Sequence, residues 1–365
     1  MPVPLLHGIF RAFPPPRMLR VSAAGLDLSD EYIKIVDFSG ARGQLRLTRH
    51  GEEKIPLGVV ENGKILKPAD LVQSLTRIRE KHGITNIIAA LPEEDAYVVK
   101  LRIPAMKRKN LREAIELQLE EFVPLKPSEA EFDYHVLREP TQDHPFFDCK
   151  VSVLPQVSVQ SYLDAFTQAG LRPLAFEIEG QALARAVIPE HDPAPLMIVD
   201  FGKWRTGIAI VVDHHLRFSA TVPFGGSHLN KQIMEKFQVS EDQAEAMKRE
   251  QKQVPAAQAE EFTSLVIASL AVLADEVNKY KLYWLDHKDE TGDSRPKLEG
   301  LYLCGGSSNI EGMCAKLQEA VGLPAQTANP WINAFSLKDH IPALPANDAL
   351  RYATAIGLAL RTHYL

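Results

Sequence analysis

Short apolar runs separated by polar turns form the pattern of residues 21–50. Val21–Leu28 alternates small and apolar residues, Tyr32–Phe38 follows a tight polar turn, and Gln44–His50 alternates again. Period-two alternation broken by short turns is typical of antiparallel strands. The pattern therefore predicts a three-stranded meander.

Helical and strand patterns follow. Leu71, Leu75 and Ile78 lie at helical spacing in the segment 67–82, and Gly83 suits the end of a helix. The segment 108–122 carries an apolar stripe opposite an acidic face. Further strands are expected at 86–91, 131–137, 147–154 and 174–178, and further helices at 157–168 and 180–187.

A proline-rich boundary at 191–195 separates this region from a second meander. The expected strands are 196–201, 206–212, 216–222 and 301–304, and the expected helices are 227–237, 241–250, 260–285, 313–321 and about 347–361.

The two regions repeat one order of elements. Asp27 and Asp200 each stand at the end of a strand, before a short turn and a second strand. Self-similarity on this scale predicts two related α/β halves rather than a solenoid. We therefore expect halves at 21–190 and 191–365, preceded by a proline-rich arm at 1–20.

Composition narrows the class of protein. The chain has 41 Lys+Arg against 47 Asp+Glu, a formal net charge of -6, which argues against a nucleic-acid binder. Three cysteines without a CxxC pair argue against a disulfide framework or a zinc site. No apolar run reaches the ~18 residues of a transmembrane helix, and the first 20 residues do not resemble a secretory signal. A cytoplasmic protein without a transmembrane segment is expected.

Two hairpins and a glycine turn suggest nucleotide chemistry. The backbone N–H groups of each hairpin can face a phosphate, and Asp27 and Asp200 can bind Mg²⁺, usually through water. Gly305–Gly306, after the strand 301–304, lets a purine or ribose approach the backbone. The turn His214–His215 is expected to be solvated rather than to bind a metal.

In this order, these elements resemble the phosphate and adenosine elements of the actin, heat-shock-chaperone and sugar-kinase fold. More narrowly, the chain resembles the PilM family, the actin-like component of type IV pilus assembly, itself similar to the cell-division protein FtsA. The phrases that carry this resemblance are Gly25–Leu28 with Ile33–Val36, Leu101–Met106, Glu121–Pro124, Phe132–Leu137, Val222–Gly226, Leu303–Gly306 with Ile310–Gly312, Ala328–Pro330 and Ala355–Leu360.

The resemblance implies an α/β, actin-like fold of duplicated ribonuclease-H-like domains. It also implies a small α+β subdomain inserted at about 96–170 and a last helix, about 347–361, that returns to the first half. ATP with Mg²⁺ is the implied cofactor, with Asp27 and Asp200 as the metal site. The implied nucleotide-binding residues are Asp27, Ser29, Lys34, Asp200, Gly202, Thr206, Glu276, Gly305, Gly306 and Ser307.

The first hairpin departs from the family pattern Asp-x-Gly-Ser/Thr. Here Asp30 and Glu31 follow Ser29, so a glycine is lost and two carboxylates are added. In the second hairpin, Lys203 and Arg205 stand where small residues are usual, and either could offset the acidic pair or mimic Mg²⁺. Hydrolysis of ATP is therefore expected to be weak or absent.

The implied partner is the cytoplasmic N-terminal segment of a PilN-like inner-membrane protein. Its groove is expected between the inserted subdomain and the first half, beside Leu101–Pro104 and Phe122–Pro124. The protein would then be cytoplasmic and peripheral to the inner membrane, with pilus motor ATPases and further copies of itself as other partners. The alternatives are a nucleotide-free adaptor, a type II secretion or competence component, and a small-molecule kinase, for which no general base stands out.

Overall fold

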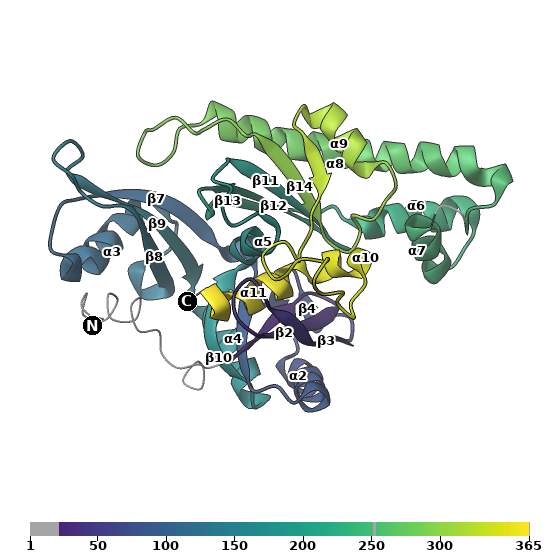
Figure 1. Cartoon of the computed structure of the whole chain (residues 1–365), viewed down its shortest axis with the longest axis horizontal. Coiled ribbons are helices and arrows are strands. Elements are labelled where there is room, and N and C mark those ends of the chain that lie inside the picture. Colours follow the sequence, from purple (N-terminus) through teal and green to yellow (C-terminus); the bar gives the residue numbers. More distant parts are fainter. Residues whose placement is uncertain (1–21, 251–252, 365) are drawn as a thin grey trace.

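The computed structural model describes residues 22–250 and 253–364, so the predicted arm lies outside the described residues. Two five-stranded sheets form the two halves (Figure 1). The first has the order β10-β6-β1-β2-β3 and the second the order β13-β12-β11-β14-β15. Each sheet contains an antiparallel hairpin followed by parallel strands, so the predicted fold class is confirmed.

The first sheet consists of β1 (Ala24–Leu28), β2 (Tyr32–Ser39), β3 (Arg46–Lys54), β6 (Asn86–Leu91) and β10 (Arg172–Ile178). Beside it lie α2 (Pro68–His82), α4 (Gln156–Gln168), α5 (Glu179–Val187) and the small pair β4 (Val60–Glu61) and β5 (Lys64–Ile65). As predicted, α2 turns Leu71, Leu75 and Ile78 into the core, and Gly83 ends it in the left-handed conformation.

The second sheet consists of β11 (Leu196–Phe201), β12 (Thr206–Val212), β13 (His215–Val222), β14 (Gly300–Cys304) and β15 (Ala325–Thr327). Its helices are α6 (Gly226–Phe237), α7 (Glu241–Arg249), α8 (Ala259–Asp286) and α9 (Met313–Val321). Short 3₁₀ turns lie at 93–95, 108–110, 127–129, 256–258 and 350–352.

A third, smaller sheet interrupts the first half. It has the order β7-β9-β8, formed by β7 (Tyr97–Pro104), β8 (Ala130–Arg138) and β9 (Phe146–Pro155). The amphipathic helix α3 (Leu111–Phe122) packs Leu111, Ile115 and Leu119 into a separate core against this sheet. We call residues 97–155 the insert. The strand β7 was not predicted, nor was β15.

The last helices connect the two halves. After α10 (Ala346–Ala349), α11 (Ala353–Tyr364) packs against α5 and β1 of the first half. The approach is close, because a Cβ atom at Gly357 would lie 1.8 Å from the carbonyl oxygen of Ala182. A side chain at position 357 therefore cannot be accommodated without moving a helix.

The long helix α8 is the element whose composition comes nearest to a membrane span. In residues 22–250 and 253–364, the stretch Ala256–Asp286 has the length and apolar composition to cross a membrane. Its buried residues, Phe262, Leu270 and Trp284 among them, belong to the core of the second half. The helix therefore packs on the core of the second half with part of its surface, and 28% of its apolar stretch is buried, while Ile267, Val272 and Leu282 are exposed.

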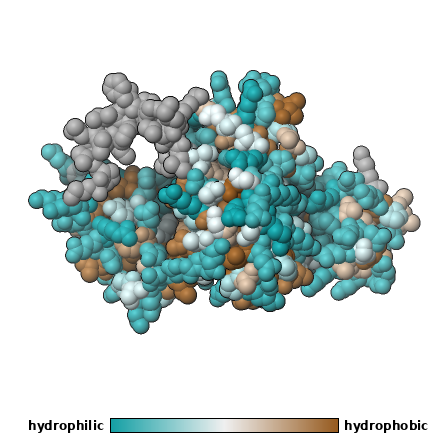
Figure 2. Space-filling model, turned by 90° about the horizontal axis from the view of Figure 1, so that it is seen from below, coloured by the Kyte–Doolittle hydropathy of each residue, from teal (hydrophilic) through white to brown (hydrophobic). Residues whose placement is uncertain are grey.

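On the face of the molecule shown in Figure 2, hydrophilic side chains predominate and hydrophobic ones are scattered among them. Because the hydrophobic side chains on this face are scattered, its cavities indicate function better than its open surface does.

Candidate functional site

A cleft lies where the β1–β2 hairpin faces the β11–β12 hairpin. It encloses a cavity of about 350 Å³. Two parallel strands of each half end near this point, so short polar loops from both halves meet in it. The cavity is lined by eight of the ten predicted nucleotide-binding residues: Asp27, Ser29, Lys34, Asp200, Gly202, Gly305, Gly306 and Ser307.

The other two predicted residues do not line the cavity. Thr206 is fully buried, and its hydroxyl donates a hydrogen bond to the carbonyl of Phe224 at 2.6 Å. Glu276, on α8, instead pairs with Lys279 on the same helix at 3.2 Å. The acidic side chains that α7 contributes to the cavity are Glu241, Asp242 and Glu245. Glu276 does not line the cavity, and its place beside a ribose stays a prediction.

Glu245 belongs to a tightly paired group on α6 and α7. Its carboxylate lies 2.6 Å from the buried Lys248 ammonium and 3.0 Å from Arg249, and it accepts a hydrogen bond from Asn230. Burial alone would raise the pKa of Glu245, but Lys248, Asn230 and Arg249 lower it to about 2. Glu245 is therefore ionised at the wall of the cleft.

Asp200 and Glu179 line the floor of the cleft, and Glu93 lies near Asp200 without lining the cavity. Burial, reinforced by the charge of Asp27, raises the pKa of Asp200 to about 6. Burial likewise raises the pKa of Glu93 to about 8, and it raises the pKa of Glu179 well above its usual range. Lys34 offsets part of this charge, because its ammonium lies 3.1 Å from the Asp27 carboxylate.

Glu179 is a cavity residue that the sequence reasoning missed. It is the first residue of α5 and directly follows β10, which runs parallel to β6 and, through it, to β1. The carboxyl ends of parallel strands share one edge of a sheet, so Glu179 reaches the same edge as Asp27. The signal available in the sequence was an acidic residue immediately after a predicted strand.

The two hairpins carry opposite charges and contact each other directly. Lys203 donates to both carboxylate oxygens of Glu31, at 3.0 and 3.1 Å. Arg205 lies 2.6 Å from Glu94 and 3.5 Å from Asp30. The two cations of the second hairpin thus offset the acidic pair of the first, as expected for these residues.

The nucleoside side of the cleft fits a nucleotide. Gly305 has a φ of +98°, and a Cβ atom there would lie 2.4 Å from Oδ1 of Asp200 and 2.5 Å from the carbonyl of Phe201. The turn Gly305–Ser307 therefore brings bare backbone to the cavity wall, which allows a flat ring or a ribose to approach closely.

The phosphate side does not fit a triphosphate with Mg²⁺ in this arrangement. Two of the hairpin N–H groups expected to face a phosphate already donate hydrogen bonds within the chain. Ser29 N–H donates to Tyr32, and Gly202 N–H donates to Asp200 and Arg205. The cations Lys203 and Arg205 are paired with carboxylates. Asp200 and Asp242 line the cavity without an ion pair to a described residue and would repel phosphate, whereas Lys54 is a lining cation with no such pair.

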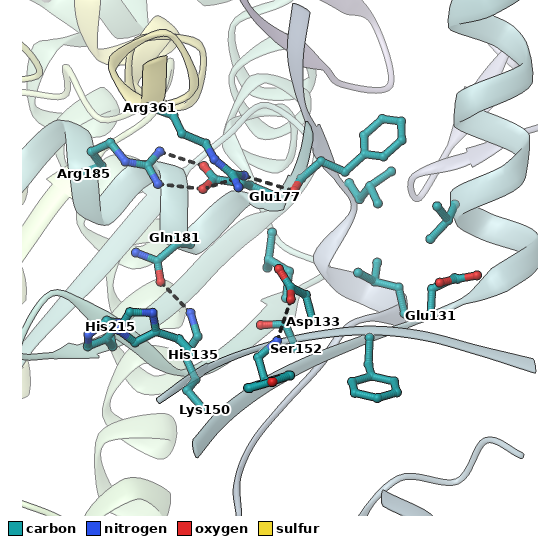
Figure 3. A pocket seen from close by; sticks show the side chains of 17 residues that line it. Glu131, Asp133, His135, Lys150, Ser152, Glu177, Gln181, Arg185, His215 and Arg361 are labelled. Carbon is teal, nitrogen blue, oxygen red and sulfur yellow. Dashed lines mark hydrogen bonds and ion pairs between the residues drawn. The ribbon is translucent and has the colours of Figure 1, made fainter. Parts of the chain in front are cut away.

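A second cavity, of about 490 Å³, lies between the insert and the first half (Figure 3). We call it the groove. Five consecutive residues of β8, 131–135, and three consecutive residues of β10, 176–178, line it. Within the described residues, β8 pairs only with β9 and β10 only with β6. The groove therefore runs along two strand edges that have no strand partner there.

Charged side chains that line the groove form specific pairs with their neighbours (Figure 3). Glu177 lies 2.6 Å from Arg185 and 3.0 Å from Arg361, all within the first half and the helix that packs on it. Lys150, from β9, donates to Gln181 on α5 at 2.8 Å. Burial lowers the pKa of Lys150 to about 8. Lys150 thus forms no ion pair with a carboxylate of any described residue.

His215 corrects the expectation of a solvated turn. It begins β13, and its ring centroid lies 4.4 Å from that of His135 at the end of the groove. Burial, followed by the charges of neighbouring basic groups, lowers the pKa of His215, and burial lowers that of His135. Both rings are therefore neutral at pH 7, which allows them to lie close together, tilted by 34° to each other.

The segments expected beside the partner's groove do not line this cavity. Leu101 and Ile103 are buried in the core of the insert, and neither Leu101–Pro104 nor Phe122–Pro124 lines the groove. Phe122 and Pro124 are exposed, and contact of a partner with them stays a prediction.

Two duplicated sheets with a cleft between their hairpins define a protein of the actin-like class. The ethanolamine utilization protein EutJ from Carboxydothermus hydrogenoformans is similar, with 16% identity, a TM-score of 0.54, and coverage of 95% of this chain and 90% of that chain. MreB5 of Spiroplasma citri bound to ADP is similar at 13% identity, with a TM-score of 0.50 and coverage of 85% and 92%.

Within that class, the chain belongs to the PilM family of type IV pilus assembly proteins, whose family model matches residues 25–363. A chain of a PilM-PilN type IV pilus biogenesis complex is similar at 22% identity, with a TM-score of 0.76. The similarity covers 94% of this chain and 99% of that chain. The family resemblance seen in the sequence is thereby confirmed.

Proposed function

We propose that this protein is a scaffold of type IV pilus assembly that docks the cytoplasmic N-terminal segment of a PilN-like inner-membrane protein in the groove. The groove is the observation that carries the proposal. It follows two strand edges, and an extended peptide can add main-chain hydrogen bonds to such an edge while its side chains enter adjoining pockets. The protein then lies on the cytoplasmic side of the inner membrane, held there by its partner.

The charges of the groove favour a peptide with both apolar and basic side chains. Glu131 and Asp133 line the groove and form no ion pair with any described residue, unlike Glu177. Leu154 and Phe176 supply apolar wall beside them. A basic side chain of the peptide would meet the two free carboxylates, and an aliphatic one would cover the apolar wall.

The test is a calorimetric titration of the full chain with synthetic peptides from the cytoplasmic N-termini of co-encoded membrane proteins. At least one peptide is expected to bind with a Kd below ~100 μM, about -5.5 kcal/mol. Asp133→Lys should weaken this binding at least tenfold, because it reverses a charge inside the groove.

Asp143→Lys is the matched control. Asp143 is also an exposed aspartate of the insert, but it does not line the groove. Its reversal should change the affinity less than twofold. Equal losses in the two variants would mean that only the net charge of the insert matters, and failure of every peptide would overturn the docking role.

The cleft enters the same proposal as a regulatory site of the scaffold. ATP with Mg²⁺ is the ligand that the sequence predicts, and the MreB5 structures hold ADP and AMPPNP. The glycine turn supports a nucleoside beside Gly305–Ser307, whereas the phosphate side is filled by paired charges. We propose no catalytic role for the cleft. The alternative is an adaptor that binds no nucleotide, and the titration of the cleft described next distinguishes it from a nucleotide-regulated scaffold.

A further inference from the structure

The contact between the two hairpins joins residues far apart in the chain. Glu31 and Asp30 follow β1, whereas Lys203 and Arg205 lie between β11 and β12 of the other half. Both carboxylate oxygens of Glu31 accept from Lys203, and Asp30 lies 3.5 Å from Arg205. The cleft is therefore bridged at its phosphate side by the chain's own ions.

These ions are largely removed from water. The side chain of Glu31 is 6% exposed and that of Arg205 is 17% exposed. Burial opposes the charge of Lys203, yet hydrogen bonds to Glu241 and Glu31 raise the pKa of Lys203 above its ordinary value. Partly buried pairs are weakly screened by salt, unlike ion pairs on an open surface.

We propose that Asp30 and Glu31 form a carboxylate latch that takes the place of nucleotide phosphates in the cleft. The latch holds Lys203 and Arg205 and brings the two halves together without a ligand. The phosphates of a nucleoside diphosphate or triphosphate compete with the latch for the same two cations. This inference rests on the proposed cleft but not on the proposed groove.

The shape of the first hairpin supports this assignment. Asp30 also accepts a hydrogen bond from the backbone N–H of Gly63 at 3.3 Å, and the Gly63 carbonyl accepts one from the buried Tyr162 hydroxyl. The acidic loop is thus anchored from behind and presents its carboxylates to the opposite half. If the two acids were only solvated surface residues, the loop would not need these hydrogen bonds.

The test compares wild type with Glu31→Gln and Asp30→Asn, titrated calorimetrically with Mg²⁺–ADP and Mg²⁺–ATP. Glu31→Gln should bind ADP at least tenfold more tightly than wild type, because it removes one of the two carboxylates that hold Lys203, leaving Glu241, and removes a repelling charge. Without nucleotide, small-angle scattering should show a larger radius of gyration for Glu31→Gln, which ADP restores to the wild-type value. Asp30→Asn should shift both quantities in the same direction by less.

Glu261→Gln is the control. It breaks the ion pair between Glu261 and Lys236, which lies within the second half, and should leave both readouts unchanged. An unchanged or lower ADP affinity in both latch variants, in protein with a normal unfolding transition, would overturn the latch. The pilus peptide is titrated against the same variants, so failure of the groove and failure of the latch give separate results.

Discussion

The groove and the cleft are both lined by charged side chains, but these charges are satisfied differently. In the cleft, Lys203 and Arg205 reach across to carboxylates of the opposite half. In the groove, Glu177 is paired within its own half, and Glu131 and Asp133 have no ion pair among the described residues. The groove thus offers free acids and strand edges to a ligand, whereas in the cleft Lys203 and Arg205 are already paired across the two halves.

This difference separates two kinds of site. A ligand that binds the free acids of the groove does not have to break an existing ion pair. The charges and shape of the unoccupied groove therefore indicate directly what can bind there. A ligand of the cleft must replace contacts that already hold the two halves together, so its binding is linked to the position of those halves.

The largest loss of stability is expected from removing Arg205, the buried cation of the cleft. Arg205→Met leaves Glu94 and Asp30 without their partner, beside the buried Glu179. Breaking a buried pair by removing one ion typically costs about 3–5 kcal/mol. Urea unfolding should show a loss of this size, and a loss below about 1 kcal/mol would show that water already screens these charges.

The pH dependence of stability should have opposite signs at the two sites. The pKa of Asp200 is raised to about 6, so the folded state binds more protons than the unfolded state between about pH 4 and 6. Its contribution is present below pH 4 and is lost as the pH rises through 6, by up to about 3 kcal/mol. Asp200→Asn should flatten this part of the curve of unfolding free energy against pH.

Lys150 in the groove should change the free energy of unfolding above neutral pH. Its pKa is lowered from 10.5 to about 8, so the unfolded state binds more protons between these values. Stability should therefore rise from pH 8 to 10.5, by up to about 3 kcal/mol. Lys150→Met should remove that rise and change stability at pH 7 little or favourably, since Lys150 contacts an amide rather than a carboxylate. A strong loss at pH 7 would mean that the groove, like the cleft, depends on a paired cation.

The smallest loss of stability is expected from weakening the contact between the insert and the second half. Lys100 and Arg102 of β7 pair with Asp293 in the loop after α8, at 3.0 and 2.7 Å. Asp293 is 47% exposed, so Asp293→Asn should cost about 0.5–1 kcal/mol in thermal or urea unfolding. Peptide affinity should stay within twofold, and a larger change would show that the second half controls the groove.

Much of the fold follows from local pattern. The alternation around β1 and β2, the helical spacing of Leu71 and Leu75, and the Asp that ends each hairpin strand lie where the sequence predicted them. The cleft was also largely predictable, because strand-end residues and glycine turns of a duplicated fold converge on one edge. The errors concern residues whose neighbours lie far away in the chain.

Glu276 and Glu245 illustrate the limit. Both are acids on predicted helices, and helical periodicity indicates which face is polar, but not which helix borders the cleft. In the structure α7 lines the cavity with Glu241, Asp242 and Glu245, whereas Glu276 of α8 does not line it. His215 shows the same limit, because the ring that it contacts, that of His135, comes from the insert.

The sequence by itself determined the class of fold, the duplicated hairpins and the acidic loop at Asp30 and Glu31, since these depend on residues a few positions apart. Only the tertiary structure decided that this loop is neutralised by Lys203 and Arg205, and that β8 and β10 border the groove. Charge pairing and cavity shape depend on distances between segments that the chain brings together only on folding, and no local pattern encodes those distances.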